Sequence, residues 1–230
     1  MRLPRFRFSR LSRAVSSLSL FALTLSIGAL SAEAFRAAPS GLRTIAVPES
    51  SIEIRIWEER NVDGTTQSFY ALTRLGEGAL GRTRQTSNEV QLASVRFDPL
   101  IGGPPQVAAS LEARPDNRLF LVQLFATALP EFQAGIAARG GIIHRYYTEH
   151  TLLVEMGPAE LSEIETLPFV RWVGDYHPSF RVENVLRDAL ASNADLDEAR
   201  YSIMLTRRGA AAQEEFAFRI RDLGGKIEVL

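Results

Sequence analysis

The clearest pattern of apolar and polar positions runs through residues 119–176, where strand and helix periods alternate twice. Residues 119–125 are almost continuously apolar, which predicts a buried strand. A helix is predicted next, because three apolar residues recur at helical spacing on one face: Leu129, Phe132 and Ile136.

The remainder of this stretch predicts a compact α+β unit. Gly140-Gly141 ends the first helix, and a hairpin follows over residues 142–156. A second helix buries another apolar stripe, formed by Leu161, Ile164 and Leu167. Residues 169–176 close the unit as a last strand. The order strand–helix–strand–strand–helix–strand predicts a ferredoxin-like domain over residues 118–177.

Alternation along the strands assigns the two faces of the predicted sheet. The face beneath the helices collects Phe120, Val122, Leu124, Leu152, Val154, Val170 and Trp172. The other face shows seven residues of mixed apolar and charged character: Leu121, Gln123, Leu153, Glu155, Arg171, Val173 and Asp175. Because a single layer of helices leaves this second face open, we expect it either to dock on a partner or to be solvated.

The chain before this domain predicts β-structure and loops. Residues 52–99 form a small β-rich segment, with a hairpin turn at Asp63-Gly64. This segment is too small for a large core of its own, so we expect it to pack on a neighbour. Residues 35–51 are expected to be a linker, and the Gly-Gly-Pro-Pro run at 102–105 marks a boundary.

Residues 200–230 repeat the first half of the domain with an offset of 84 positions. The matching pairs are Phe132 and Phe216, Ile136 and Ile220, Gly140 and Gly224, and Gly141 and Gly225. The copy reaches only its second strand, so it predicts an incomplete second unit. We expect the chain to be the front part of a longer protein, or the second unit to complete itself on a partner.

The first 34 residues have the layout of a secretory signal peptide. Five arginines precede an apolar run, and Ala32-Glu33-Ala34 places small residues at the −3 and −1 positions of a cleavage site. The run is about 17 residues long and contains Ser and Gly, which argues against a membrane anchor. We expect cleavage after Ala34, a secreted location (extracellular or periplasmic), and no membrane attachment of the mature form.

Composition narrows the chemistry. Without the first 34 residues the chain has 21 basic and 26 acidic residues, a net charge of about −5, which argues against a nucleic-acid partner. The absence of cysteine excludes disulfides and thiolate metal sites. His144, His150 and His177 lack metal-ligand spacing, and no serine lies in a nucleophile motif. We therefore expect no catalytic residue, metal or cofactor, although His144 or His177 could sense pH at a docked interface.

Several of these features resemble the propeptide domain of subtilisin-like serine proteases. The resemblance is carried by Gly140-Gly141, the apolar strand at 152–154, and residues 161–173, which end in the closing strand Pro168-Phe169-Val170-Arg171-Trp172-Val173. A β-rich segment followed by tandem units is similar to the N-terminal regions of some large bacterial secreted subtilases. The Asp, His and Ser motifs of a subtilase catalytic domain are absent from this chain.

The resemblance implies a pro-region that assists the folding of a protease catalytic domain and inhibits it. The partner is then the catalytic domain of a subtilisin-like protease, on which the second sheet face docks. The resemblance also implies a tail that contacts the cleft, and this tail is expected to be extended: Tyr176, His177, Pro178, Ser179 and Phe180. Two alternatives stay open, a secreted or envelope interaction module without a protease, and a small-ligand sensor built from paired ferredoxin-like units.

Overall fold

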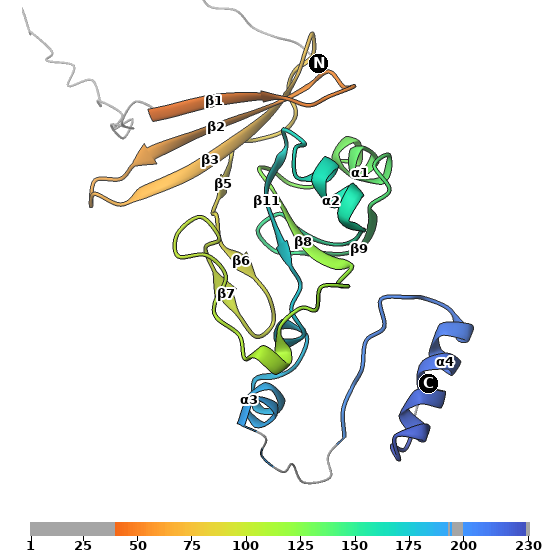
Figure 1. Ribbon diagram of the computed structural model, residues 1–230. Helices are drawn as coiled ribbons and strands as arrows, with labels where there is room; N and C mark the ends of the chain where they lie inside the picture. The colour runs from red at the N-terminus through yellow and green to blue at the C-terminus, as the bar shows by residue number, and fades with distance from the viewer. Residues whose placement is uncertain (1–39, 193, 195–199, 229–230) are drawn as a thin grey trace, which may run out of the picture. The chain divides into compact units, whose positions relative to one another are not determined.

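The computed structural model describes residues 40–192, 194 and 200–228. These residues form a mixed α and β structure with antiparallel sheets and four α-helices (Figure 1). The predicted signal peptide lies outside the described residues, so cleavage after Ala34 and the secreted location stay predictions.

Five strands form the N-terminal sheet: β1 Ser40–Ala46, β2 Ile52–Arg60, β3 Thr66–Arg74, β4 Gly78–Ala79 and β5 Arg84–Thr86. The predicted turn joins β2 to β3, and Gly64 takes the positive φ of 86° that such turns require. The linker prediction is wrong for residues 40–46, because β1 pairs antiparallel with β2 and buries Ile45.

Two short strands follow, β6 Val90–Gln91 and β7 Arg96–Phe97, which pair antiparallel. Apolar and polar positions alternate over residues 89–97, which predicts one continuous strand. The chain instead reverses, because the Leu92 N–H donates to the Val95 carbonyl at 2.9 Å and closes a tight turn. A 3₁₀ helix, η1 Ala109–Leu111, lies in the loop that leads to the next sheet.

Four strands form the central sheet: β8 Leu119–Leu124, β9 Ile142–Tyr147, β10 Thr151–Glu155 and β11 Val170–Asp175. Their order is β11-β8-β10-β9, and every neighbouring pair is antiparallel. Helix α1, Pro130–Ala137, connects β8 to β9, and helix α2, Pro158–Ile164, connects β10 to β11. Both helices lie on the same side of the sheet (Figure 1). The strands and helices predicted within residues 119–176 are therefore present.

One hydrophobic core joins the two helices, one face of the central sheet and the N-terminal sheet. Phe132 of α1 stacks on Phe169 with ring centroids 4.7 Å apart, and Phe132, Ile136 and Ile164 have no exposed surface. The N-terminal sheet contributes Ile45, Val47, Ile52, Ile54, Tyr70 and Leu72. The prediction that the β-rich segment packs on a neighbour is confirmed.

The described residues after β11 contain three helices. These are the 3₁₀ helix η2 Pro178–Phe180 and the α-helices α3 Asn184–Ser192 and α4 Ala210–Asp222. Helix α4 lies where the sequence repeat predicts a helix. The repeat also predicts strands on both sides of it, but residues 201–205 and 226–228 form none. A strand needs a hydrogen-bonded neighbour, and the described residues provide none for these two segments.

Candidate functional site

A β-bulge in β11 changes the assignment of the sheet faces. Val170 lies opposite Leu124, but Trp172 lies opposite Gln123, so Arg171 is an extra residue in the strand. Trp172 consequently packs on the face away from the helices. The prediction that Trp172 lies beneath the helices is wrong.

Val173 moves the opposite way. It lies opposite Val122 and packs against the core beneath the helices. Its assignment to the docking face is therefore wrong, and so is that of Asp175, which lies opposite Phe120. One extra residue exchanges the faces of the residues that follow it in the strand.

The face away from the helices is covered by the chain's own segments. Leu121 and Gln123 have no exposed surface, and Leu153 is only 3% exposed. The residues that cover them come from β6, β7, the end of β11 and η2: Val90, Phe97, Tyr176 and Phe180. We call residues 87–97 the covering segment; its two strands lie beside the central sheet in Figure 1. The prediction of an open face is wrong for Leu121, Gln123 and Leu153.

Two polar residues of the predicted docking face fix the covering segment to the sheet. Gln123 Nε2 donates to the carbonyls of Asn88 at 2.9 Å and Glu89 at 3.3 Å. Arg171 Nη1 donates to the carbonyl of Ser87 at 2.8 Å. Both side chains thus donate hydrogen bonds to backbone carbonyls of the covering segment. A partner that docked on this face would have to break these bonds.

Arg171 also connects the central sheet to the N-terminal sheet. Its guanidinium lies 5.0 Å from the centroid of the Phe125 ring, and the guanidinium of Arg43 in β1 lies 4.9 Å from the same centroid. Burial lowers the pKa of Arg171 to about 10, while the charges of Asp98 and Glu149 act in the opposite direction. The side chain stays charged at neutral pH, so both cation–π contacts persist there.

The two acidic residues of the predicted docking face are paired within the chain. Glu155 Oε2 lies 2.8 Å from His144 Nε2, across the β9–β10 hairpin. Asp175 Oδ1 accepts a hydrogen bond from Asn117 Nδ2 at 2.9 Å. These carboxylates stabilise the ends of the sheet and form no cluster.

The predicted tail folds back on the domain. Pro178–Phe180 form η2, and Tyr176, Ser179 and Phe180 are buried. The ring of Phe180 lies 5.9 Å from that of Phe97 in the covering segment. The expectation of an extended tail is wrong, because η2 directs Phe180 into the second apolar cluster.

Polar contacts hold the first two residues of this tail. His177 Nδ1 accepts a hydrogen bond from the Ala113 N–H at 2.9 Å. The hydroxyls of Tyr176 and Tyr147 are hydrogen-bonded at 3.0 Å, and Arg181 donates to the Tyr176 carbonyl. Burial, followed by the hydrogen bond to Tyr147, raises the pKa of the Tyr176 hydroxyl above its usual range.

His150 lies in an environment that the sequence did not predict. It lies in the β9–β10 loop with a φ of 60°, and its ring packs edge-on against Tyr70 of β3 at 5.1 Å. Its Nε2 atom is buried, with no hydrogen-bond partner among the described residues. Burial, reinforced by the charges of Arg171 and Arg84, lowers the pKa of His150 to about 4. No local signal reveals this, because its burial depends on β3, far away in the sequence.

A hollow of about 320 Å³ opens between the loop after β7, η1, η2 and α3, lined in part by Val95, Leu111 and Phe180. Its polar lining includes Arg187, which already pairs with Asp188 at 3.1 Å. Within the part of the chain described, no group of three or more His, Cys, Asp or Glu residues could hold a metal ion. The same residues contain no helix that is long and apolar enough to cross a membrane.

Comparison with known proteins defines a region and assigns it no activity. Residues 91–177 match a protein family described as a domain of unknown function (DUF8729). The match begins in β6 and ends just after β11, so it includes most of the covering segment together with the central sheet. No curated protein and no solved structure matches the chain.

Proposed function

We propose that residues 119–176 form a ferredoxin-like domain and that the chain is the pro-region of an exported subtilisin-like serine protease. The strand order β11-β8-β10-β9, with antiparallel neighbours and both helices on one face, supports the first part. The pro-region proposal is supported by the positions of the residues that resemble subtilase propeptides. Gly140-Gly141 ends α1, and residues 168–173 lead into and form most of β11.

In this role the chain carries no catalytic residue and acts by binding another domain. Its partner is the catalytic domain, whose folding it assists and whose cleft it inhibits before maturation. Folds dominated by non-local contacts form slowly, so a bound template that stabilises the transition state accelerates folding. Export through the predicted signal peptide places both parts in the same compartment.

The covering segment determines how strongly such a pro-region docks through its sheet face. Phe97 is central to the cover, because its ring lies 5.9 Å from the rings of both Trp172 and Phe180. Docking on this face requires the covering segment to move away first. The affinity is then reduced by the fraction of molecules in which the face is free.

We expect the exported chain to inhibit a subtilisin-like protease competitively, and the variant Phe97→Ala to inhibit about tenfold more tightly. The substitution weakens the packing of the covering segment and changes no residue of the sheet face beneath it. Inhibition constants from hydrolysis of a small chromogenic peptide measure the effect, with Val62→Ala, on an exposed turn, as the matched control. If neither the exported chain nor Phe97→Ala inhibits, the pro-region proposal is wrong.

A second candidate function is an exported interaction module with no protease attached, and the edge strand β9 favours it. β9 is the last strand in the order β11-β8-β10-β9, so one of its edges has no neighbouring strand in the described sheet. Ile142 and Tyr146 on β9 are 57% and 48% exposed. An exposed edge with apolar side chains can accept an extended peptide as an additional strand.

This alternative predicts that Tyr146→Lys weakens the binding of extended apolar heptapeptides by about tenfold, because a lysine on an edge strand disfavours strand addition. Fluorescence anisotropy with a labelled peptide library measures the binding. Val62→Lys, which places the same charge on an exposed turn, is the control. Equal affinities of the two variants, or no binding of any peptide, would exclude the β9 edge as the binding surface.

A further inference from the structure

Helix α1 ends in a motif that the C-terminal segment repeats. The Gly141 N–H donates to the Ile136 carbonyl at 3.1 Å, and the Gly140 N–H donates to the Ala137 carbonyl at 2.9 Å. Gly140 has a φ of 82°. This pair of hydrogen bonds around a left-handed glycine is a Schellman motif.

Helix α4 ends in the same motif 84 positions later. The Gly225 N–H donates to the Ile220 carbonyl at 2.8 Å, and the Gly224 N–H donates to the Arg221 carbonyl at 2.9 Å. Gly224 has a φ of 84°. The sequence repeat is therefore also a structural repeat at the end of the helix.

The second glycine of each motif allows the same close approach. A Cβ atom at Gly141 would lie 2.7 Å from Ile136 Cγ2, and one at Gly225 would lie 2.6 Å from Ile220 Cγ2. In both places the chain turns tightly over an isoleucine of the preceding helix. In α1 that isoleucine belongs to the buried core stripe.

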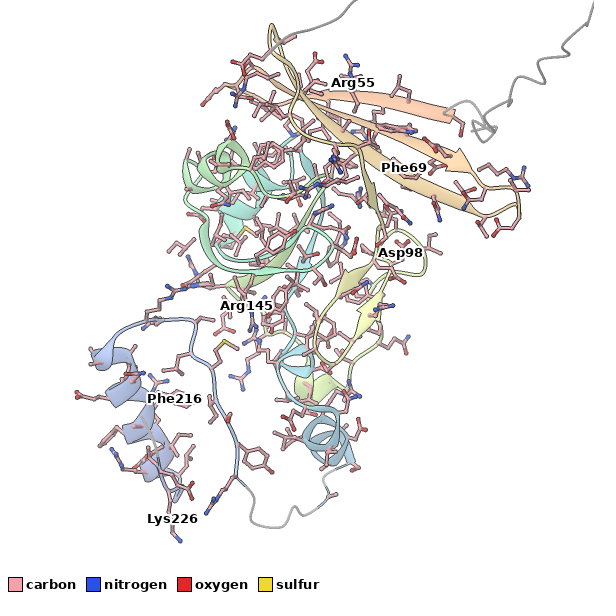
Figure 2. The ribbon with its side chains drawn as sticks, turned by 180° about the vertical axis from the view of Figure 1, so that it is seen from behind. Arg55, Phe69, Asp98, Arg145, Phe216 and Lys226 are labelled. Atoms are coloured by element: carbon pink, nitrogen blue, oxygen red, sulfur yellow. The ribbon has the colours of Figure 1, made fainter. Side chains whose placement is uncertain are left out.

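The two helices differ in what covers this stripe. In the central domain the stripe of α1 is covered by residues from α2 and from the loop that follows it. Phe169 stacks on Phe132, and Ile164 of α2 packs close to Gly141. The corresponding Phe216 and Ile220 of α4 are only half-buried (Figure 2 labels Phe216 on α4). Residues 201–228 also expose five large apolar side chains: Tyr201, Ile203, Met204, Phe218 and Leu223.

The central sheet shows what a second half must look like. It consists of two strand–helix–strand halves, β8-α1-β9 and β10-α2-β11. Exchanging the halves turns the order β11-β8-β10-β9 into β9-β10-β8-β11, which is the same order reversed. The halves thus occupy equivalent places, which two identical halves can fill around a two-fold axis.

We propose that the C-terminal segment, residues 201–228, is a dimerisation element whose partner is the same segment of a second copy. The two copies of residues 203–205 pair antiparallel at the centre of a new sheet, as β8 and β10 do. Residues 226–228 begin the outer strands, and the two α4 helices cover one face. The segment has five basic and four acidic residues, so two copies repel each other little. The proposal goes beyond the proposed function and does not depend on a protease.

Sedimentation equilibrium of the exported chain tests this between about 1 and 100 µM. We expect a reversible monomer–dimer equilibrium. Phe216→Asp should raise the dissociation constant at least about tenfold, because it places a charge in the apolar stripe. The matched control is Phe218→Asp, since Phe218 is 69% exposed and corresponds to the exposed Ala134 of α1. This control should leave the dissociation constant nearly unchanged.

Hydrogen exchange provides a second measurement that does not depend on a variant. We expect amides of residues 203–205 to become protected as the concentration rises, because they form strands only in the dimer. A single monomer mass at every concentration would overturn the proposal. So would a dimer that resists Phe216→Asp, or one that forms without protection of residues 203–205.

Discussion

Replacing Leu121 by Ala is expected to lower the free energy of unfolding by about 2–5 kcal/mol. Leu121 has no exposed surface and packs in the second apolar cluster with Val90 and Phe97 of the covering segment. The truncation leaves a cavity between the sheet and that segment. Urea denaturation at neutral pH measures the loss.

The control for this experiment is Ile142→Ala on the edge strand β9. Ile142 is 57% exposed, so its truncation should change the free energy of unfolding by no more than about 0.5 kcal/mol. The comparison separates a covered face from an open one. A loss at Leu121 as small as that at Ile142 would mean that the covering segment does not pack on the sheet in solution.

Acidification from pH 6.5 to pH 4 is expected to destabilise the protein by about 2–3 kcal/mol through His150 alone. The folded-state pKa of about 4 lies below the ordinary value of 6.5, so the unfolded chain binds more protons between these two values. Stability is therefore complete above pH 6.5 and is lost as the pH falls towards 4. The cause is the transfer of a positive charge into a buried place beside two arginines.

Among the described residues, no carboxylate is hydrogen-bonded to the His150 ring. The groups that face it are Tyr70 of β3, Arg84 of β5, Tyr146 of β9 and Arg171 of β11. The carboxylate of the neighbouring Glu149 accepts a hydrogen bond from Ser87 Oγ at 3.1 Å. Protonation should consequently weaken the contact between the N-terminal sheet and the β9–β10 hairpin.

His150→Asn is the matched variant, because asparagine tolerates the positive φ at this position. Thermal unfolding followed across this pH range should show a smaller acid-induced loss for the variant than for the parent chain. Arg84→Gln should reduce the loss by a smaller amount, since it removes one of the two repelling charges. Equal losses in the parent chain and in His150→Asn would contradict the account.

The secondary structure of residues 119–176 was predictable because each element is specified locally. Pro130 and Gly140 bound a helix whose apolar spacing is unambiguous, and β8 is almost continuously apolar. The assignment of the sheet faces failed where the structure departs from the regular alternation of a strand. Nothing in the sequence marks Arg171 as an extra residue, yet this bulge exchanges the positions of Trp172 and Val173.

The covering of the sheet was not predictable from periodicity, because it depends on segments distant in the chain. Val90 and Phe97 lie in separate strands of two residues each, although the alternation of this stretch predicts one continuous strand. Phe180 lies in a single 3₁₀ turn. An apolar side chain in such a short element indicates that the element packs on something, but it does not indicate on what.

These differences change the expectation of how the chain docks on a partner. The resemblance to subtilase propeptides suggested a sheet face and a tail that were ready to dock. In the structure the face is covered and the tail is folded, so docking through either requires a rearrangement. The two proposed surfaces at β9 and at residues 201–228 lie outside this covered face.

Thiol labelling tests the covered face most directly, because the chain contains no cysteine and a single substitution provides a unique thiol. Leu153→Cys places that thiol on the covered face, and Ile142→Cys places it on the exposed edge of β9. We predict that under native conditions the Leu153→Cys thiol reacts at least about 100-fold more slowly than the Ile142→Cys thiol, because it reacts only when the cover opens. Equal labelling rates would contradict the covered face, on which the account of this protein depends.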